Sequence, residues 1–290
     1  MITSRKTVAM FGAGGFIGSH LARHLATRDG CYRLFCYDLV SDKLTRIAGG
    51  SGYEFVTCDI RTDTETLELA VRAADLVIDL VAYANPALYL SRPLDVVQLN
   101  LFDNLKIVEL CARHGRRLVQ FSTCEVYGKS DGRGGTFQED HSDCTLGPIV
   151  NQRWIYSCAK QLLERMLHAR GLDKSIEYTI IRPFNFIGPD MDYLIHSPAD
   201  GIPRVFPQFM SALLYNLPLR LVDGGRSLRS FTYIDDAVDA IEIILSKPVE
   251  TRNQILNVGN PANEIAIADL AVKMRRTFEQ LTGRPCSVPI

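Results

Sequence analysis

The stretch that most constrains the fold lies near the N-terminus, where an apolar run passes directly into a glycine-rich turn. Residues 7–11 have the composition of a short strand, and Gly12-Ala13-Gly14-Gly15-Phe16-Ile17-Gly18 follows without a break. Apolar residues then recur at positions 17, 21 and 25, which is helical spacing. A strand, a glycine turn and a helix in this order predict the beginning of a parallel α/β sheet.

The glycines at positions 12, 15 and 18 have the spacing of a dinucleotide-binding turn. The first permits the tight turn, the second lets the backbone approach a pyrophosphate, and the third lets helix and strand pack closely. A second strand, residues 32–37, ends in Asp38, whose carboxylate favours the ribose of NAD over the 2′-phosphate of NADP. A glycine turn that merely packs is the alternative. The cofactor contacts expected here are Gly12, Gly15, Phe16, Ile17, Gly18 and Asp38.

Strand and helix continue to alternate through the first half of the chain. We predict strands at 53–58, 76–82 and 117–123, and helices at 64–73 and 94–114. Asp59 and Ile60 follow the 53–58 strand and are further cofactor candidates, although Asp59 has an equal chance of capping the next turn. The alternation predicts an α/β fold, a Rossmann-type doubly wound parallel sheet with helices on both faces.

The regular alternation stops soon after a strand at 178–183. We therefore divide the chain into an NAD-binding domain, residues 1–183, and a smaller C-terminal substrate-binding α/β subdomain, residues 184–290. Within the latter we predict helices at 235–245 and 267–282, and a strand near 254–258 that returns to the first domain. Arginines and aromatic residues mix between positions 204 and 233. Because arginines clamp diphosphates and aromatic rings stack on bases, this mixture predicts a nucleotide-linked substrate.

Tyr156 and Lys160 are four residues apart on a predicted helix, so they share one face. They are candidates for catalysis and for contact with the cofactor. A phenol has a pKa of about 10 and must lose roughly 3 units, about 4 kcal/mol, to act as a base near neutrality. One cation at about 4 Å supplies about that much at an effective dielectric of about 20. We therefore expect Lys160 to make Tyr156 a usable base, although most such pairs are structural.

Thr123, Cys124 and Glu125 end the strand at 117–123. Ligands of open α/β sheets bind beyond the carboxyl ends of the strands, so these residues are expected at the catalytic site. Thr123 would hold the reacting hydroxyl, and Glu125 is a candidate acid or base. Cys124 is more often a packed thiol than a reactive one. Residues 129–152 are rich in turn residues and predict a loop over this site.

The composition narrows the compartment and the partners. A net charge of −1 gives no reason to expect nucleic acid or an anionic membrane. Eight cysteines occur without a Cys-x-x-Cys pair or metal-ligand spacing with histidine, which indicates reduced thiols in a cytoplasmic protein and no metal site. No apolar segment is long enough to span a bilayer. The helices at 94–114 and 156–170 offer surfaces for a homodimer.

Four motifs carry a resemblance that covers essentially the whole chain: the glycine turn at 12–18, Ser-Thr-Cys-Glu-Val-Tyr-Gly at 122–128, Tyr156 with Lys160, and Arg-Pro-Phe-Asn at 182–185. The chain resembles the extended short-chain dehydrogenase/reductases, a family of NAD-dependent epimerases and dehydratases. Within that family it is similar to the plant UDP-apiose/UDP-xylose synthases and the bacterial UDP-glucuronate decarboxylases. The runs 121–129, 152–165 and 221–225 carry this narrower similarity.

The resemblance implies that Tyr156 takes the C4 hydroxyl proton of UDP-glucuronate while NAD accepts the hydride, after which the 4-keto acid loses CO₂. The product would be UDP-xylose, a UDP-4-keto-pentose or UDP-apiose, and Glu125 would serve the proton transfers. It also implies a set of substrate-binding residues, namely Tyr89, Arg153, Asn185, Arg204, Arg220 and Arg229.

Two departures from the family pattern bear on this expectation. Apiose synthases have a second active-site cysteine in the segment matching 83–86, where this chain has Ala84. The family also continues into a C-terminal segment with a Tyr…Arg motif, and no such segment precedes Ile290, so we expect a truncated form. The alternatives are a nucleotide-sugar 4-epimerase or dehydratase, and an NAD-binding protein with impaired catalysis.

Overall fold

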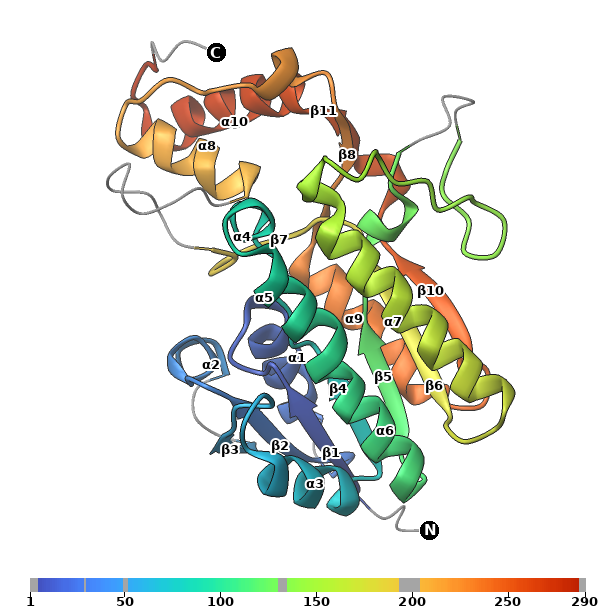
Figure 1. Ribbon diagram of the computed structural model, residues 1–290. Coiled ribbons are helices and arrows are strands. Elements are labelled where there is room, and N and C mark those ends of the chain that lie inside the picture. Colours follow the sequence, from blue (N-terminus) through green and yellow to red (C-terminus); the bar gives the residue numbers. More distant parts are fainter. Residues whose placement is uncertain (1–4, 29, 49–51, 130–134, 193–203, 287–290) are drawn as a thin grey trace.

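The computed structural model describes residues 5–28, 30–48, 52–129, 135–192 and 204–286. Within these residues the central element is a seven-stranded parallel sheet in the order β10-β6-β5-β4-β1-β2-β3 (Figure 1). Its strands are β1 (Lys6–Phe11), β2 (Tyr32–Asp38), β3 (Tyr53–Thr57), β4 (Leu76–Asp79), β5 (Arg117–Phe121), β6 (Tyr178–Pro183) and β10 (Gln254–Val258).

Helices cover both faces of this sheet, as an apolar sheet buried on both sides requires (Figure 1). One face packs against α1 (Phe16–Ala26) and α9 (Ile234–Ser246). The other face packs against α3 (Thr64–Ala73), α6 (Asn104–His114) and α7 (Ile155–Leu172). The predicted doubly wound Rossmann-type fold is confirmed.

The strand order reverses at β1, which pairs with β2 on one side and with β4 on the other. Open α/β sheets bind ligands in the crevice at such a switch point, beyond the carboxyl ends of the strands. The glycine turn follows β1 directly, and the short helix α2 (Asp42–Ala48) follows β2. The fold therefore places a crevice above the N-terminal end of α1.

The helix predicted at 94–114 is not one regular α-helix. It consists of α5 (Pro93–Val97), a π-helical segment (Gln98–Asp103) and α6. Asn100, in the π segment, donates to the carbonyls of Val96 at 2.9 Å and Tyr83 at 3.2 Å and accepts from the Tyr83 amide. This side chain therefore fixes the loop after β4. Ahead of α5 lies α4 (Pro86–Ser91), which Asn85 caps by accepting from the Ala87 amide.

The smaller elements lie beyond the strand ends, most of them toward the top of Figure 1. They are α8 (Val205–Leu214), α10 (Ile267–Thr282), an antiparallel pair formed by β8 (Leu228–Ser230) and β11 (Glu264–Ala266), and a parallel pair formed by β7 (Phe186–Ile187) and β9 (Thr232–Tyr233). Phe209, Leu270 and Met274 are part of a separate apolar cluster between α8 and α10. The strand expected near 254–258 is β10, which pairs with β6 and so joins the main sheet. The boundary drawn at residue 183 stays a prediction.

None of the helices in the described part of the chain combines the length and apolar character needed to cross a membrane.

Candidate functional site

The glycines of the turn after β1 differ in what they leave room for. A Cβ on Gly12, whose φ is 80°, would lie 2.9 Å from the Leu80 carbonyl carbon and the Val81 nitrogen. A Cβ on Gly18 would lie 2.4 Å from the Gly12 oxygen, so this glycine permits the close packing of α1 on the turn. A Cβ on Gly15 would meet one atom of the described residues within 4 Å, the Gly12 oxygen at 3.3 Å. Its open side faces a cavity.

Besides Gly12 and Gly18, Gly14 is a third glycine without room for a side chain, and the spacing pattern did not single it out. A Cβ there would lie 2.2 Å from the Val40 oxygen and 3.1 Å from the Asp38 carboxyl group. The Gly14 amide donates to Asp38 Oδ2 at 2.8 Å, and the Leu39 amide donates to Oδ1 at 2.7 Å. Burial raises the pKa of Asp38, and these backbone donors oppose that rise. Asp38 therefore fixes the turn, and its contact with a ribose stays a prediction.

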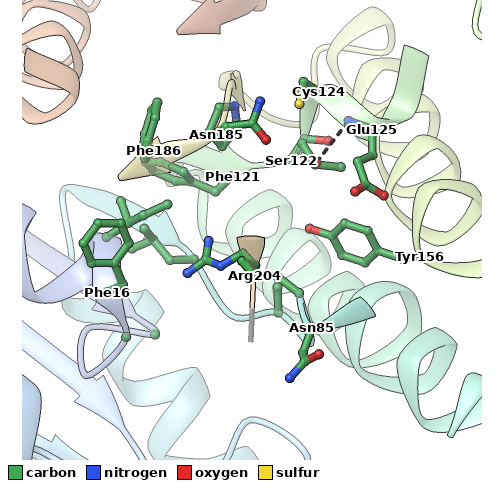
Figure 2. A pocket seen from close by; sticks show the side chains of 18 of the residues that line it. Phe16, Asn85, Phe121, Ser122, Cys124, Glu125, Tyr156, Asn185, Phe186 and Arg204 are labelled. Carbon is green, nitrogen blue, oxygen red and sulfur yellow. Dashed lines mark hydrogen bonds between the residues drawn. The ribbon is translucent and has the colours of Figure 1, made fainter. Parts of the chain in front are cut away.

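The first cavity has a volume of about 390 Å³ and lies between the glycine turn and the ends of β4, β5 and β6. Figure 2 shows the Tyr156 hydroxyl pointing toward the middle of this cavity, with Phe16 on the opposite side. Many of the predicted site residues line it: Gly12, Gly15, Phe16, Ile17, Gly18, Tyr89, Thr123, Cys124, Glu125, Tyr156, Asn185 and Arg204. Residues far apart in the chain thus meet at one site.

Tyr156 is buried near the start of α7 and is held by two neighbours. Its ring stacks on that of Tyr89, with centroids 4.9 Å apart and planes 10° from parallel. Burial raises the pKa of Tyr156 well above its usual value, and the negative charge of Glu125 raises it further. A hydrogen bond from the Thr123 hydroxyl acts in the opposite direction. Thr123 also accepts from the Glu125 amide at 3.1 Å.

Lys160 lies one helical turn from Tyr156 and is 1% exposed. Its Nζ donates to the Phe121 carbonyl at 3.2 Å. Burial lowers the pKa of Lys160, while Asp79 and then Glu164 raise it. Burial and then the charge of Glu125 are the largest influences on the pKa of Tyr156, and both raise it, so the expected effect of Lys160 on that pKa stays a prediction.

Glu125 forms an ion pair with Arg153 at 3.3 Å, and the Arg153 guanidinium lies 4.8 Å from the Trp154 ring centroid. Arg153 precedes α7 in a 3₁₀ turn that Asn151 caps. Burial raises the pKa of the Cys124 thiol to about 12, with Glu125 adding to the rise, so this thiol is protonated at neutral pH. The Cys124 thiol is therefore a weak proton donor at neutral pH, and the role of Glu125 in proton transfer stays a prediction.

Arg204 precedes α8 and reaches the first cavity from the side of the glycine turn. Its guanidinium is paired with the Asp192 carboxylate at 2.7 and 3.0 Å and lies 5.9 Å from the Phe16 ring centroid. Asn185 has a left-handed backbone with φ of 41°, and its side chain donates to the Ser230 carbonyl at 2.9 Å. Asn185 therefore ties the end of β6 to the elements beyond the sheet.

A second cavity of about 830 Å³ adjoins the first and shares Cys124, Glu125 and Asn185 with it. Arg153 and Arg229 line this second cavity, together with residues 135–137 and Glu139 of the predicted loop. That loop is held by Glu139, which accepts from the Asn257 amide at 2.7 Å. Residues 130–134 of the loop lie outside the described residues.

Five predicted site residues line neither cavity within the described chain, namely Asp38 and Lys160, which were placed above, and Arg220, Asp59 and Ile60. Arg220 is exposed, and its contact with a substrate stays a prediction. Asp59 caps the turn after β3 by accepting from the Arg61 amide at 3.0 Å, and the Arg61 side chain lowers the pKa of Asp59. Ile60 is buried. The turn-capping alternative for Asp59 is confirmed, and the adenine contact stays a prediction.

The residues around the first cavity fit a dinucleotide. The α1 helix begins at the glycine turn with neither a capping side chain nor an acidic residue in its first turn, which leaves its amides suited to a pyrophosphate. The Ser122 hydroxyl lines the cavity and is buried without a hydrogen-bond partner among the described residues. Sequence reasoning had not assigned a role to Ser122, although it adjoins Thr123. Such an unpaired hydroxyl fits a cofactor that brings polar groups.

Comparisons with known proteins agree with this geometry. A model of the NAD-dependent epimerase/dehydratase family matches residues 8–259. A UDP-D-apiose/UDP-D-xylose synthase of Oryza sativa subsp. japonica is 41% identical, and the match covers 96% of this chain and 75% of the synthase. The crystal structure of the PbgP3 protein from Burkholderia pseudomallei has a TM-score of 0.86 and a sequence identity of 36% to this chain. The match covers 95% of this chain and 81% of the PbgP3 chain.

A UDP-glucuronic acid 4-epimerase from Bacillus cereus, solved with UDP-glucuronic acid and NAD, has a TM-score of 0.77. It is 21% identical, and the match covers 98% of this chain and 84% of the epimerase. At that identity the likeness extends to the fold alone.

Proposed function

The chain belongs to the NAD-dependent epimerase/dehydratase family and is an NAD-dependent enzyme, and from this premise we propose that it oxidises UDP-glucuronate at C4 and decarboxylates it. The observation that carries the proposal is the position of Tyr156, whose hydroxyl points into the cavity bounded by the glycine turn (Figure 2). The 41% identity to a UDP-apiose/UDP-xylose synthase supports the substrate class.

NAD would be held by the glycine turn and would supply the acceptor for the C4 hydride and a positively charged ring. Tyr156 takes the proton of the C4 hydroxyl, and Thr123, which hydrogen-bonds the phenol in the structure, is placed to bind that hydroxyl as well. A ketone at C4 makes the carboxylate at C5 easy to lose as CO₂, because the carbonyl accepts the electrons of the breaking bond. The chain's part in this step is to orient the sugar and to hold protons.

Glu125 and Arg153 supply the remaining chemistry near the sugar. Their side chains are 28% and 39% exposed, so both are accessible to a substrate that enters between the two cavities. We assign Arg153 to the sugar carboxylate and Glu125 to the proton that replaces CO₂. Asn185, Arg204 and Arg229 line the cavity walls and are assigned to the nucleotide diphosphate. The product is UDP-xylose, the UDP-4-keto-pentose or UDP-apiose.

The test is to incubate the protein with NAD and UDP-glucuronate and to measure CO₂ and sugar products by mass spectrometry. We expect CO₂ release, reduced by about 10²-fold to 10⁴-fold in Tyr156→Phe, because a positioned acid or base contributes about that much. Tyr53→Phe makes the same chemical change on β3 and should leave the rate unchanged. Formation of UDP-galacturonate without CO₂ release would show that the activity is 4-epimerisation and not decarboxylation. Binding of NAD without turnover would leave an NAD-binding protein with impaired catalysis.

We also propose that the chain forms a homodimer through the outer face of the α5 to α7 helices. Leu94, Phe102 and Leu162 on this face are 80%, 54% and 47% exposed. Covering such apolar surface with a second copy removes it from water. Light scattering should give a dimer mass, and the double substitution Phe102→Glu with Leu162→Glu should give a monomer. Leu281→Glu on α10, where the leucine is 82% exposed, is the matched control. A monomeric wild type would refute the dimer.

A cytoplasmic, reducing compartment is proposed on the cysteines. All eight are described, and each is a free thiol in the structure. A protein with many unpaired thiols suits a reducing environment. Titration of free thiols in protein extracted under alkylating conditions should count eight, and a lower count that a reductant restores would contradict the assignment.

A further inference from the structure

A row of buried polar side chains crosses the sheet beneath α6 and α7. Asp79 at the end of β4 pairs in register with Gln120 on β5, and the Gln120 amide donates to Asp79 Oδ2 at 2.8 Å. Asp79 is 0% exposed and Gln120 is 1% exposed. Asp79 Oδ1 accepts from the Val81 amide at 2.9 Å. A carboxylate so deep inside an apolar sheet is costly unless a positive charge is close to it.

Lys160 and Glu164 enter the same buried layer from α7, and Arg182 enters it from β6. Arg182 binds both oxygens of Glu164, at 3.0 and 2.6 Å, so these two charges satisfy one another. The side chains of that pair are 5% and 6% exposed. With Glu164 committed to Arg182, Asp79 is the buried carboxylate left to balance the ammonium of Lys160.

We propose that Asp79 is a positioning residue, which keeps the buried Lys160 ammonium charged and aimed along α7 toward Tyr156. Lys160 makes its hydrogen bond to the Phe121 carbonyl, and Phe121 follows Gln120 directly on β5. Asp79 and Gln120 therefore adjoin the strand end that Lys160 binds. The inference rests on the proposed role of Tyr156 in proton transfer and on the role predicted for Lys160 beside it, and it adds the counter-charge that Lys160 requires.

The electrostatics of the layer agree with this geometry. Burial lowers the pKa of Lys160, and Asp79 is the largest influence that raises it. Burial raises the pKa of Asp79, and Lys160 is the largest influence that lowers it. Cys111 from α6 and Glu164 from α7 also act on this pair, and Arg182 from β6 is paired with Glu164. Cys111 is a neutral thiol, because burial and Asp79 raise its pKa.

Asp79→Asn tests the charge with little change in shape. The new amide oxygen still accepts from the Val81 amide. Gln120 can turn its own amide around, because its Oε1 is buried without a partner among the described residues. Asp103→Asn is the matched control, since Asp103 is 2% exposed and pairs with Lys106 at 2.8 Å instead of Lys160. Thermal unfolding of both variants checks the fold.

The first readout is the ionisation of Lys160 in protein without substrate. NMR of lysine side chains labelled with carbon-13 monitors this ionisation, and the Lys160→Arg variant assigns the Lys160 signal. We expect Lys160 to stay protonated at pH ~8 in the wild type and its pKa to fall by about 1 unit or more in Asp79→Asn, because a removed negative neighbour disfavours the ammonium. Asp103→Asn should leave it unchanged. A wild-type Lys160 that is neutral at pH ~7, or an unchanged pKa in Asp79→Asn, would overturn the proposal.

The second readout is the pH profile of kcat with UDP-glucuronate and NAD. Loss of the Lys160 proton ends activity at high pH, so Asp79→Asn should move this alkaline limb down by about 1 unit. A purely structural role would lower kcat or Tm without moving the limb. Because the NMR titration needs no substrate, a wrong assignment of UDP-glucuronate and a wrong role for Asp79 give different results.

Discussion

The rings of Tyr89 and Tyr156 lie nearly parallel, with centroids 4.9 Å apart and an angle of 10° between their planes. Tyr89 comes from α4 and Tyr156 from α7, so the stack joins two elements on the side of the cavity away from the glycine turn. Both rings are buried. A base that must meet a sugar hydroxyl within hydrogen-bond reach needs such a fixed ring.

Two substitutions of Tyr89 should distinguish the contribution of its ring stack from that of its hydroxyl. Tyr89→Phe keeps the ring and should retain Tm and most of kcat. Tyr89→Leu removes the aromatic pair, which contributes about 0.5–1.5 kcal/mol beyond its buried area, and leaves the Tyr156 ring free to tilt. We expect a lower Tm and a kcat reduced by about 10-fold or more for Tyr89→Leu, measured by thermal unfolding and CO₂ release. Equal loss in both variants would instead assign the function to the Tyr89 hydroxyl.

Glu125 should control the pH at which Tyr156 ionises. A negative neighbour disfavours the phenolate and so raises the pKa of Tyr156. Glu125→Gln removes that charge, and the phenolate should therefore form at lower pH. Arg153→Gln leaves the Glu125 carboxylate unpaired and should move the phenolate to higher pH. The ultraviolet difference spectrum against Tyr156→Phe reports the ionisation directly. Shifts of the same sign in both variants would contradict this account.

Alanine in the glycine turn should separate cofactor binding from packing. Gly15→Ala meets one oxygen at 3.3 Å within the described chain, so Tm should change little. Its methyl group enters the space assigned to the pyrophosphate, and the Kd for NAD should rise by about 10-fold or more, which is about 1.4 kcal/mol. Gly18→Ala meets backbone atoms at 2.4 and 2.7 Å and should lower Tm sharply. NAD titration and thermal unfolding measure both effects, and unchanged NAD affinity in Gly15→Ala would place the cofactor elsewhere.

The sheet of this protein was predictable because its signals are local. Strands β1 and β2 are short apolar runs, and the glycine turn and Asp38 punctuate them in a fixed order. The interruption of the helix at 98–103 was not predictable, since it depends on Asn100 binding the backbone of Tyr83, 17 residues away. A helical period carries no information about such a tertiary contact.

Helix α8 was missed for a different reason. Its sequence, Val-Phe-Pro-Gln-Phe-Met-Ser-Ala-Leu-Leu, is apolar all round and includes Pro207, which reads as a helix breaker. Pro207 lies in the first turn, where its missing N–H is not needed, and α10 covers the apolar surface.

Within the site, the motif residues Thr123, Glu125 and Tyr156 were found from sequence because their spacing is informative. Asp79 was passed over as part of a buried strand. The signal that could have identified Asp79 is an acidic residue within an otherwise apolar strand.

The buried pair of Arg182 and Glu164 should dominate the stability of the layer beneath α7. Glu164→Gln leaves the Arg182 guanidinium buried without a counter-charge, and breaking such a pair costs about 3–5 kcal/mol. The hydrogen bond from Arg182 to the Tyr127 hydroxyl at 2.8 Å does not replace the lost charge. Urea unfolding should therefore show a much lower midpoint with an unchanged slope.

The matched control is Glu109→Gln, which breaks the ion pair at the surface between Glu109 on α6 and Arg170 on α7. Water solvates the charge that remains there, so the midpoint should hardly move. A double variant with Glu164→Leu and Arg182→Met removes both buried charges and should recover much of the loss, because an apolar pair needs no counter-charge. If Glu164→Gln unfolds at the wild-type midpoint, the buried layer is hydrated in solution and its charges do not depend on one another.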